Sequence, residues 1–340
     1  MRIVIPRESV AGEHRTSATP ETVKKMIRLG AEVAIESGAG AAVGFTDNIY
    51  TELGAEIVTD RAALLGSADM VLRLRKPESD DIDMMKSGCI HVSYLDPFNE
   101  RDLIKTLAAK GITAISMEMI PRSTRSQKMD ALSSQANLAG YVAVMLAAAK
   151  LPSIFPMLMT PAGTLKPAKV FIIGAGVAGL QAIATAKRLG ARVTAFDTRP
   201  VVAEQVQSLG GKFLEIDLGD TGQTADGYAK ELTPEQVDIQ RQAQKDVIAD
   251  SDVVITTAQV FGRKPPVLVT KDMVEGMAPG SVVVDMAAET GGNVEGSVPD
   301  ETVVVDGVTI VGTANLANEV ARDASQMYAS NLFNLVEDTW

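Results

Sequence analysis

Three glycines at a fixed spacing form the motif with the clearest chemistry in this sequence. Gly174, Gly176 and Gly179 make a Gly-x-Gly-x-x-Gly pattern directly after the apolar run "KVFII" of residues 169–173. Glycines at this spacing permit a tight turn, a close approach of the backbone to a pyrophosphate, and close packing of a helix on a strand. The N-terminus of the following helix offers unpaired N–H groups to the phosphates. The motif therefore predicts a dinucleotide site.

An acidic residue completes this motif. Asp197 ends the next apolar run, about twenty residues into the unit, where a carboxylate accepts hydrogen bonds from an adenosine ribose. A carboxylate there repels the extra phosphate of NADP, so the motif favours NAD(H). Arg199 opposes this preference, because an arginine near that position can accommodate the phosphate. The alternative interpretation is a Gly-rich turn with a purely structural role.

A polar segment precedes the alanine-rich run in the middle of the chain. Residues 122–140 read "RSTRSQKMDALSSQANLAG". Polar side chains in such a mixture are costly to bury without partners. Arg122 can donate in a fixed fork geometry, and Gln127 and Asp130 offer partners for a carboxamide. The structural alternative is that Asp130 caps a helix beginning near Ala131.

Apolar runs rich in β-formers alternate with helical patterns from end to end. The runs are "RIVI" (2–5), "EVAI" (32–35), "MVLRL" (70–74), "CIHVSY" (89–94) and "ITAISM" (112–117), then "KVFIIG", "RVTAFD", "DVVITTA" and "SVVVDMA" within 169–312. This alternation predicts an α/β protein of two doubly wound, Rossmann-like domains with parallel sheets, joined by helices with a cleft between them. We expect residues 1–130 plus 315–340 to form the N-terminal domain and residues 131–314 to form the NAD(H)-binding domain.

Composition bounds the class of protein. A net charge of −11 argues against nucleic acid as a partner. The single cysteine, Cys89, excludes a disulfide framework, fits the cytosol, and is expected to be a small core residue. No spacing of Cys, His, Asp and Glu suggests a metal site. We expect no membrane span, because the most apolar run is stopped by Lys150 and Pro152 before the ~18–20 residues that a span needs.

The first half of the chain resembles the alanine dehydrogenase and nicotinamide nucleotide transhydrogenase superfamily. The resemblance rests on "MRIVIPRESVAGEHRTSATPETV", "ESGAGAAVGFTD", "GAEIV" and "LRLRKP". In alanine dehydrogenases an arginine of an "ExR" turn, a lysine at a strand end and a histidine after the next strand handle the amino acid. Here the turn is Glu13-His14-Arg15, but Arg75 stands in the place of the lysine and Asp96 in that of the histidine. Lys76 is displaced by one position, which would turn it the other way, and His91 lies within a predicted strand, where a core role is expected.

The missing residues distinguish two activities. Oxidative deamination needs a proton acceptor, whereas hydride exchange between two nicotinamides needs none. The remaining motifs look like the NAD(H)-binding component of proton-translocating transhydrogenases over essentially the whole chain. They are "PRSTRSQKMDALSSQANLAGY", "GAGVAG", "AFDTRP", "EQVQSLGGKFLE", "ADGYAKEL", "TTAQVFGRKPPVLVT" and "GSVVVDMAAETGGN".

This resemblance implies a set of site residues. Arg122, Asp130 and Ser133 would contact the nicotinamide end of NAD(H), while Gln127 would face the second nucleotide. Gln127, Arg122 and Asp130 are therefore the expected catalytic residues. The other expected cofactor-binding residues are Gly174, Gly176, Val177, Gly179, Asp197, Thr198, Arg199, Gly227, Tyr228, Gln242 and Gln259. Gly227 and Tyr228 would belong to a mobile loop that closes over the nucleotide, although composition alone suits an ordinary surface loop.

The resemblance also implies a function. The chain would position NADH for direct hydride transfer to NADP+ on a partner component, coupled to proton translocation by a membrane-spanning component. It would be a homodimer, peripheral on the cytoplasmic face of the membrane. Two alternatives remain, an alanine-dehydrogenase-type amino acid dehydrogenase and an NAD-binding regulatory module without catalysis.

Overall fold

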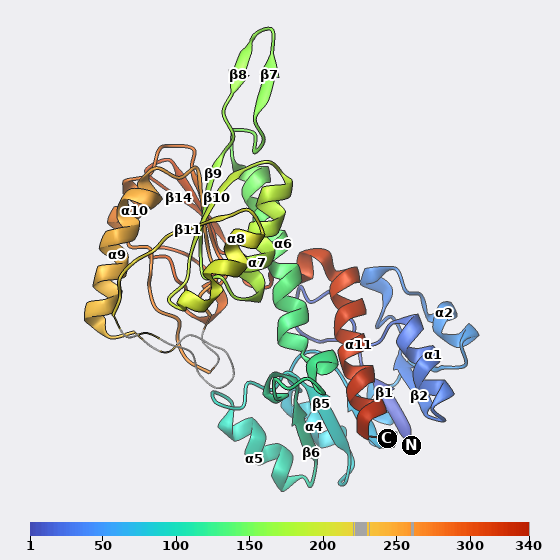
Figure 1. Cartoon of the computed structure of the whole chain (residues 1–340). Helices are drawn as coiled ribbons and strands as arrows, with labels where there is room; N and C mark the ends of the chain where they lie inside the picture. The colour runs from blue at the N-terminus through green and yellow to red at the C-terminus, as the bar shows by residue number, and fades with distance from the viewer. Residues whose placement is uncertain (220, 222–229, 231, 260–261, 340) are drawn as a thin grey trace. The chain divides into compact units, whose positions relative to one another are not determined.

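The computed structural model describes residues 1–219, 221, 230, 232–259 and 262–339. The chain forms two compact units (Figure 1), which are treated separately below. Unit 1 consists of Met1–Gln135 and Val320–Trp340, and unit 2 consists of Ala136–Glu319. The predicted fold class is confirmed, because both units are α/β with Rossmann-like, mainly parallel sheets.

Unit 1 is built on a six-stranded parallel sheet with the order β3-β2-β1-β4-β5-β6. Its strands are β1 (Arg2–Ile5), β2 (Glu32–Glu36), β3 (Glu56–Val58), β4 (Met70–Leu72), β5 (Ile90–Ser93) and β6 (Thr113–Ser116). Its helices are α1 (Pro20–Arg28), α2 (Asp47–Glu52), α3 (Arg61–Ser67), α4 (Ser79–Met84), α5 (Arg101–Ala109) and α11 (Ala321–Thr339), with short 3-10 turns at Ala41–Val43, Met117–Met119 and Gln127–Met129. All five strands predicted in this half are present, and β3 is an additional edge strand.

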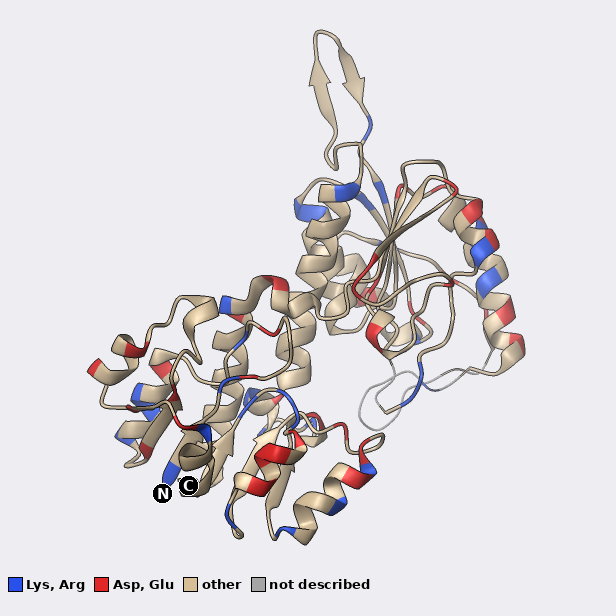
Figure 2. Cartoon of the chain, turned by 180° about the vertical axis from the view of Figure 1, so that it is seen from behind, with Lys and Arg blue, Asp and Glu red and all other residues tan. Residues whose placement is uncertain are grey.

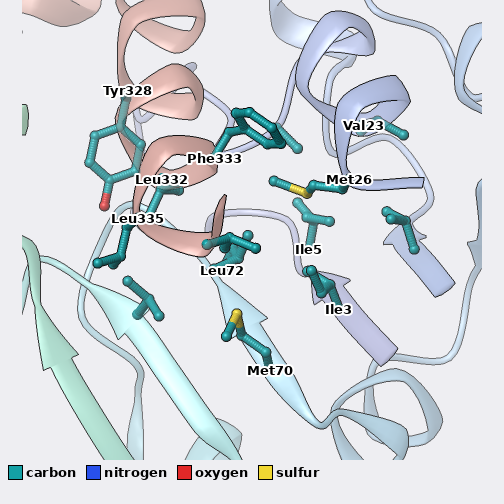
Figure 3. Packing of buried hydrophobic residues seen from close by; sticks show 14 of the residues in the cluster. Ile3, Ile5, Val23, Met26, Met70, Leu72, Tyr328, Leu332, Phe333 and Leu335 are labelled. Atoms are coloured by element: carbon teal, nitrogen blue, oxygen red, sulfur yellow. The ribbon is translucent and has the colours of Figure 1, made fainter. Parts of the chain in front are cut away.

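Helix α11 returns to unit 1 and closes one face of its core. Figure 3 shows Leu332 and Phe333 of α11 beside Met26 of α1 and Leu72 of β4. Tyr328 is also fully buried, and its hydroxyl donates to the carbonyl oxygen of Arg73 at 3.0 Å. Burying one large apolar side chain contributes about 1.5–3 kcal/mol, so several from one helix make α11 an integral part of unit 1.

Unit 2 contains a seven-stranded sheet in its described residues, with the order β11-β10-β9-β12-β13-β15-β14. Its strands are β9 (Lys169–Ile173), β10 (Arg192–Phe196), β11 (Lys212–Phe213), β12 (Val253–Thr256), β13 (Val282–Asp285), β14 (Thr302–Val305) and β15 (Val308–Val311). Its helices are α7 (Val177–Arg188), α8 (Ala203–Ser208), α9 (Pro234–Ala249) and α10 (Lys271–Glu275), with 3-10 turns at Pro200–Val202, Ala288–Thr290 and Leu316–Val320.

One strand of this sheet departs from the parallel arrangement that the sequence predicted. Strand β14 pairs with β15 in the antiparallel direction. The two strands are joined by Asp306 and Gly307, whose φ angles are 47° and 81°. Positive φ at both central residues defines the tight hairpin turn for which Asp-Gly is a preferred sequence. Two strands so joined must run antiparallel, because a parallel connection needs a long crossover.

A second hairpin lies in the segment after residue 150. Strands β7 (Leu158–Thr160) and β8 (Gly163–Leu165) pair only with each other among the described residues. In Figure 1 this hairpin extends away from the rest of unit 2. Met159 is 72% exposed, and Leu158 and Leu165 are also exposed. The hairpin therefore presents apolar side chains and unpaired strand edges to its surroundings.

Helix α6 (Ala131–Lys150) begins in unit 1 and continues into unit 2. With 20 residues and a mean hydropathy of 1.2, it is long and apolar enough to cross a membrane by length and composition alone. The expectation of no membrane span stays a prediction, because the core helix of a folded protein passes the same test and 39% of the most apolar window of α6 is buried. The first turn of α6 is bonded to protein, since Ser134 donates to the Asn331 side chain at 2.7 Å and Gln135 donates to the Ala324 carbonyl at 3.0 Å.

The order of strands reverses at one point in each sheet. Strand β1 lies between β2 and β4, and β9 lies between β10 and β12. In open parallel sheets, ligands bind outside the carboxyl ends of the strands at such a point. In unit 2 these ends are followed by Gly174 after β9 and by Thr257 after β12. The predicted glycine motif therefore stands where this topology places a ligand.

Candidate nucleotide-binding site

Two glycines of the turn after β9 are required by close contacts within the protein. Gly174 has a φ of 102°, and a Cβ atom on it would lie 2.4 Å from Oγ1 of Thr257. A Cβ atom on Gly179 would lie 1.9 Å from the carbonyl oxygen of Gly174. No side chain fits at that distance, so Gly179 allows α7 to pack directly on the end of β9. These contacts confirm the turn and the close helix–strand packing that the motif predicts.

Gly176 differs, because the space beside it is open. It is the N-terminal cap of α7 with a φ of −76°, a conformation that any residue adopts. The nearest heavy atom to a Cβ on Gly176 would be Nη2 of Arg199, at 4.0 Å. Neither strain nor packing explains this glycine, whereas a pyrophosphate lying against the backbone would. Val177, the first residue of α7, follows it and is 38% exposed.

Asp197 directly follows β10 and is held by the glycine turn. Its Oδ2 accepts a hydrogen bond from the Ala175 amide at 2.8 Å. Its Oδ1 accepts from the Arg199 amide at 2.9 Å, and the Arg199 guanidinium donates to both oxygens. These hydrogen bonds raise the pKa of Arg199 above its usual range, against the lowering effect of burial. Thr198, between the two, accepts a hydrogen bond from the Thr221 hydroxyl on its carbonyl oxygen at 2.8 Å.

The loop after β12 flanks the point where the strand order of the unit 2 sheet reverses, next to the glycine turn after β9. The Thr257 hydroxyl donates to the carbonyl oxygen of Gly174 at 3.2 Å, which ties the loop to the glycine turn. The Gln259 side-chain amide donates to the carbonyl oxygen of Met286, which directly follows β13, at 2.7 Å. The loop is also held by buried Asn293, whose side chain bonds both the amide and the carbonyl of Ala258. Asn293 is the last residue of the run "GSVVVDMAAETGGN", but it was not among the residues predicted for the site.

The glutamines of helix α9 differ in burial, which identifies those that face the protein interior. Gln242 lies on its exposed face. Gln240 and Gln244, one helical turn apart, are 2% and 0% exposed, and their side chains hold buried polar atoms without hydrogen-bond partners among the described residues. In Figure 2 the colours along α9 mark several acidic and basic residues. A buried amide without partners costs about 1–3 kcal/mol and calls for an explanation. Gln240 and Gln244 are thus better candidates for a ligand contact than Gln242.

The polar segment in the middle of the chain gathers three of its predicted residues in unit 1. Asp130 accepts hydrogen bonds from the Ser133 amide at 2.9 Å and from the Ser133 hydroxyl at 2.6 Å. It therefore caps α6, as the structural alternative proposed. Nε of Arg122 lies 3.7 Å from Oδ2 of Asp130. Gln127 is exposed at the start of a 3-10 turn, and its side chain makes no hydrogen bond to the described residues.

A second charged cluster in unit 1 involves the "ExR" turn. The Glu13 carboxylate accepts two hydrogen bonds from the Arg15 guanidinium, both 2.7 Å, and one from Nε of Arg75 at 2.8 Å. Burial alone would raise the pKa of Glu13, but the hydrogen bonds and charges of the two arginines lower it to about 2. Arg15 also donates to the Gln135 side chain at 2.9 Å. Both arginines are thus engaged by a carboxylate of the chain itself.

The histidine and cysteine within the predicted strand have the core roles that the sequence indicated. His91 is fully buried, its Nε2 lies 3.0 Å from the Ser93 hydroxyl, and burial lowers its pKa to about 3. Cys89 is fully buried, and burial raises the pKa of its thiol to about 11. Lys76 forms an ion pair with Glu100 near the surface.

The predicted loop residues Gly227 and Tyr228 lie outside the residues that the structure describes. The loop function therefore stays a prediction from the sequence.

Comparisons with known proteins agree over the whole chain. Residues 4–139 match the family described as alanine dehydrogenase/PNT, N-terminal domain, and residues 143–339 match the corresponding C-terminal domain. The chain is 46% identical to an NAD(P) transhydrogenase subunit alpha protein of Rhodospirillum rubrum, over 99% of this chain and 89% of that protein. It is 31% identical to alanine dehydrogenase of Bacillus subtilis, over 87% of this chain and 72% of that protein. The crystal structure of a transhydrogenase from Sinorhizobium meliloti matches with a TM-score of 0.90 and 43% identity, covering 100% of this chain and 94% of the other.

Proposed function

This chain belongs to the alanine dehydrogenase/PNT family, and we propose that within it the chain is the NAD(H)-binding component of a proton-translocating transhydrogenase. The two activities named among its relatives, transhydrogenase and alanine dehydrogenase, make different demands on the protein. Amino acid oxidation requires a group that accepts a proton from the substrate, whereas direct hydride exchange requires only position and electrostatics.

The observation that carries the proposal is the state of Arg75, Lys76 and His91, the basic residues at or near the positions of the expected lysine and histidine. Arg75, in the place of the expected lysine, is bonded to Glu13. Lys76 is paired with Glu100, and His91 is buried with a pKa of about 3. A fully buried histidine that stays neutral at physiological pH cannot pass a proton to solvent. These residues support transhydrogenation over amino acid oxidation.

The glycine turn of unit 2 supports NAD(H) as the nucleotide. The open backbone at Gly176 suits the pyrophosphate, the N-terminus of α7 supplies N–H groups, and Asp197 supplies the acceptor for the adenosine ribose. Gln240 and Gln244 are further contact candidates, because buried polar atoms of their side chains have no hydrogen-bond partner in the part of the chain that the structure describes. When bound, NAD(H) supplies the hydride that passes directly to a second nicotinamide.

For the nicotinamide end we assign the cluster that caps α6. Arg122 and Asp130 offer a donor and an acceptor to a carboxamide, and Ser133 orients the Asp130 carboxylate through its hydrogen bonds. Exposed Gln127 would face the second nucleotide, NADP(H), held by a partner component. The catalytic contribution of these side chains would be orientation of the ring, not acid–base chemistry.

The partners follow from the same proposal. An NADP(H)-binding component would accept the hydride, and a membrane-spanning component would couple the transfer to proton movement, with this chain peripheral on the cytoplasmic face. We further assign the β7–β8 hairpin to a homodimer contact. A two-stranded hairpin is marginally stable alone, and its exposed Met159 and Leu158 would be covered by a second copy of the chain.

Reconstitution tests the function. Mixed with a purified NADP(H)-binding component of a transhydrogenase, the chain is expected to catalyse reduction of an NADP+ analogue by NADH, followed by absorbance. The matched control is Asp197→Ala, which should lose transfer at low NADH concentrations. NADH oxidation that depends on pyruvate and ammonia, by this chain alone, would instead establish the amino acid dehydrogenase. NADH binding without any transfer in the mixture would favour the regulatory module.

A further inference from the structure

The Asp197 carboxylate is saturated by donors of its own chain. Its Oδ1 accepts from the amide and from Nε of Arg199, both at 2.9 Å. Its Oδ2 accepts from the Ala175 amide at 2.8 Å and from Nη2 of Arg199 at 2.9 Å. An ionised carboxylate has about four acceptor positions, and here all four are occupied.

The four donors are of two kinds. The amides of Ala175 and Arg199 belong to the backbone of the two turns and stay in place whenever unit 2 is folded. The two guanidinium donors belong to a flexible side chain, and they take one acceptor position on each oxygen. A pair of adjacent ribose hydroxyls would need the same arrangement, one hydrogen bond to each oxygen.

The Arg199 guanidinium also lies beside the glycine turn. Its Nη2 is the heavy atom nearest to the open side of Gly176, at 4.0 Å from the position of a Cβ atom there. The side chains of Asp197 and Arg199 are only 7% and 14% exposed. Their ion pair is therefore well shielded from water, and separating it has a real energetic cost.

We propose that the Arg199 guanidinium occupies the positions on Asp197 that the adenosine ribose needs. Arg199 must therefore be displaced from Asp197 when NAD(H) binds. The proposal rests on the nucleotide site proposed above and adds a competitor to it. Displacement lowers the affinity for NADH and NAD+ alike. A chain that must release its oxidised nucleotide in each cycle would gain from such a competitor, because release becomes faster.

Calorimetric titration with NADH tests the competition. Arg199→Ala is expected to tighten NADH binding about fivefold, because the ribose no longer has to break the ion pair. Arg199→Lys, which keeps the charge but cannot span both oxygens, should fall between the two. The control is Arg192→Ala, which removes an exposed cation at the far end of the same strand and should leave the affinity unchanged.

A double-mutant cycle separates competition from a merely structural role. In the Asp197→Asn background, removing the Arg199 side chain should no longer tighten NADH binding, because the ion pair is already lost. An NADH analogue without the 2′-hydroxyl of the adenosine ribose should gain less from Arg199→Ala than NADH does. Thermal unfolding of each variant without ligand shows whether it is folded.

The outcomes distinguish the two proposals. If the unchanged chain does not bind NADH, the nucleotide site itself is wrong and the competition falls with it. If the unchanged chain binds NADH but Arg199→Ala and Arg199→Lys bind it equally well or more weakly, only the competition is overturned. Weaker binding by both variants would make Arg199 a direct contact to the nucleotide.

Discussion

Gly176 and Gly179 lie three residues apart in one turn, yet replacing each by alanine should have opposite consequences. At Gly179 a Cβ atom would meet the Gly174 carbonyl oxygen at 1.9 Å. That oxygen is backbone and cannot rotate away, and the Gly174 amide is itself anchored to the Phe196 carbonyl at 2.8 Å. Helix α7 would have to move outward by more than about 1 Å, since Cβ contacts below about 3 Å are not tolerated.

The stability cost of Gly179→Ala should therefore reach the upper end of overpacking, about 3 kcal/mol. In a unit of this size that corresponds to a melting temperature lower by roughly 6–12 °C. Gly176→Ala should change stability by no more than about 0.5 kcal/mol, because its φ is ordinary and its Cβ would be 4.0 Å from the nearest heavy atom. The new methyl group would instead occupy space needed by the pyrophosphate, so NADH affinity should fall at least about tenfold.

Differential scanning calorimetry without ligand and NADH titration of the same preparations measure the two effects. Gly66→Ala is the matched control, because it lies within α3 of unit 1 and its Cβ would have an ordinary 3.6 Å contact. It should lose neither stability nor affinity. If Gly176→Ala bound NADH as well as the unchanged chain does, the turn would not hold the pyrophosphate. An unchanged melting temperature for Gly179→Ala would refute the packing argument.

Three further outcomes are expected. Glu13→Gln should lower the free energy of unfolding, measured in urea at neutral pH, by roughly 3 kcal/mol, because the pKa of Glu13 falls from 4.5 to about 2 on folding. This loss of stability should shrink as the pH falls through that range. A loss of stability that is independent of pH would contradict the ion-pair account. Gln127→Ala should slow hydride transfer in the reconstituted system and leave NADH affinity unchanged; an unaffected rate would remove its proposed role. Met159→Lys should convert a dimer to monomers in analytical ultracentrifugation, and a chain that is monomeric without the change would exclude the hairpin contact.

The sequence was most informative where several local signals agree. The run 169–173, the three glycines and the following helix each point to one strand–turn–helix unit, and the structure contains it as β9 and α7. His91 and Cys89 were predicted as core residues from their position inside an apolar run, and both are fully buried. In these cases the physical cause is local, because backbone preferences and hydrophobic pattern act over a few neighbouring residues.

Elements that depend on distant contacts were missed. Gln242 was named from the family resemblance and stays a prediction, whereas the burial of Gln240 and Gln244 depends on the phase of α9 against the sheet, which the sequence alone does not give. Strand β14 differs, because a local signal marks it: the Asp306–Gly307 turn joins it to β15. The β7–β8 hairpin lacks a core of its own, so its strands carry no burial pattern.

The pairing of Asp197 with Arg199 shows how geometry changes the meaning of a motif. Taken separately, the carboxylate favours NAD(H) and the arginine favours the phosphate of NADP(H). In the structure the two charges neutralise each other over bonds of 2.9 Å. For Arg199 to bind a phosphate it would have to leave Asp197, and the phosphate would then face a carboxylate that no cation compensates. A ribose hydroxyl meets no such repulsion, because it donates to the carboxylate that the arginine vacates. At the proposed nucleotide site the ion pair would therefore strengthen the preference for NAD(H), and Arg199 would contribute to excluding NADP(H).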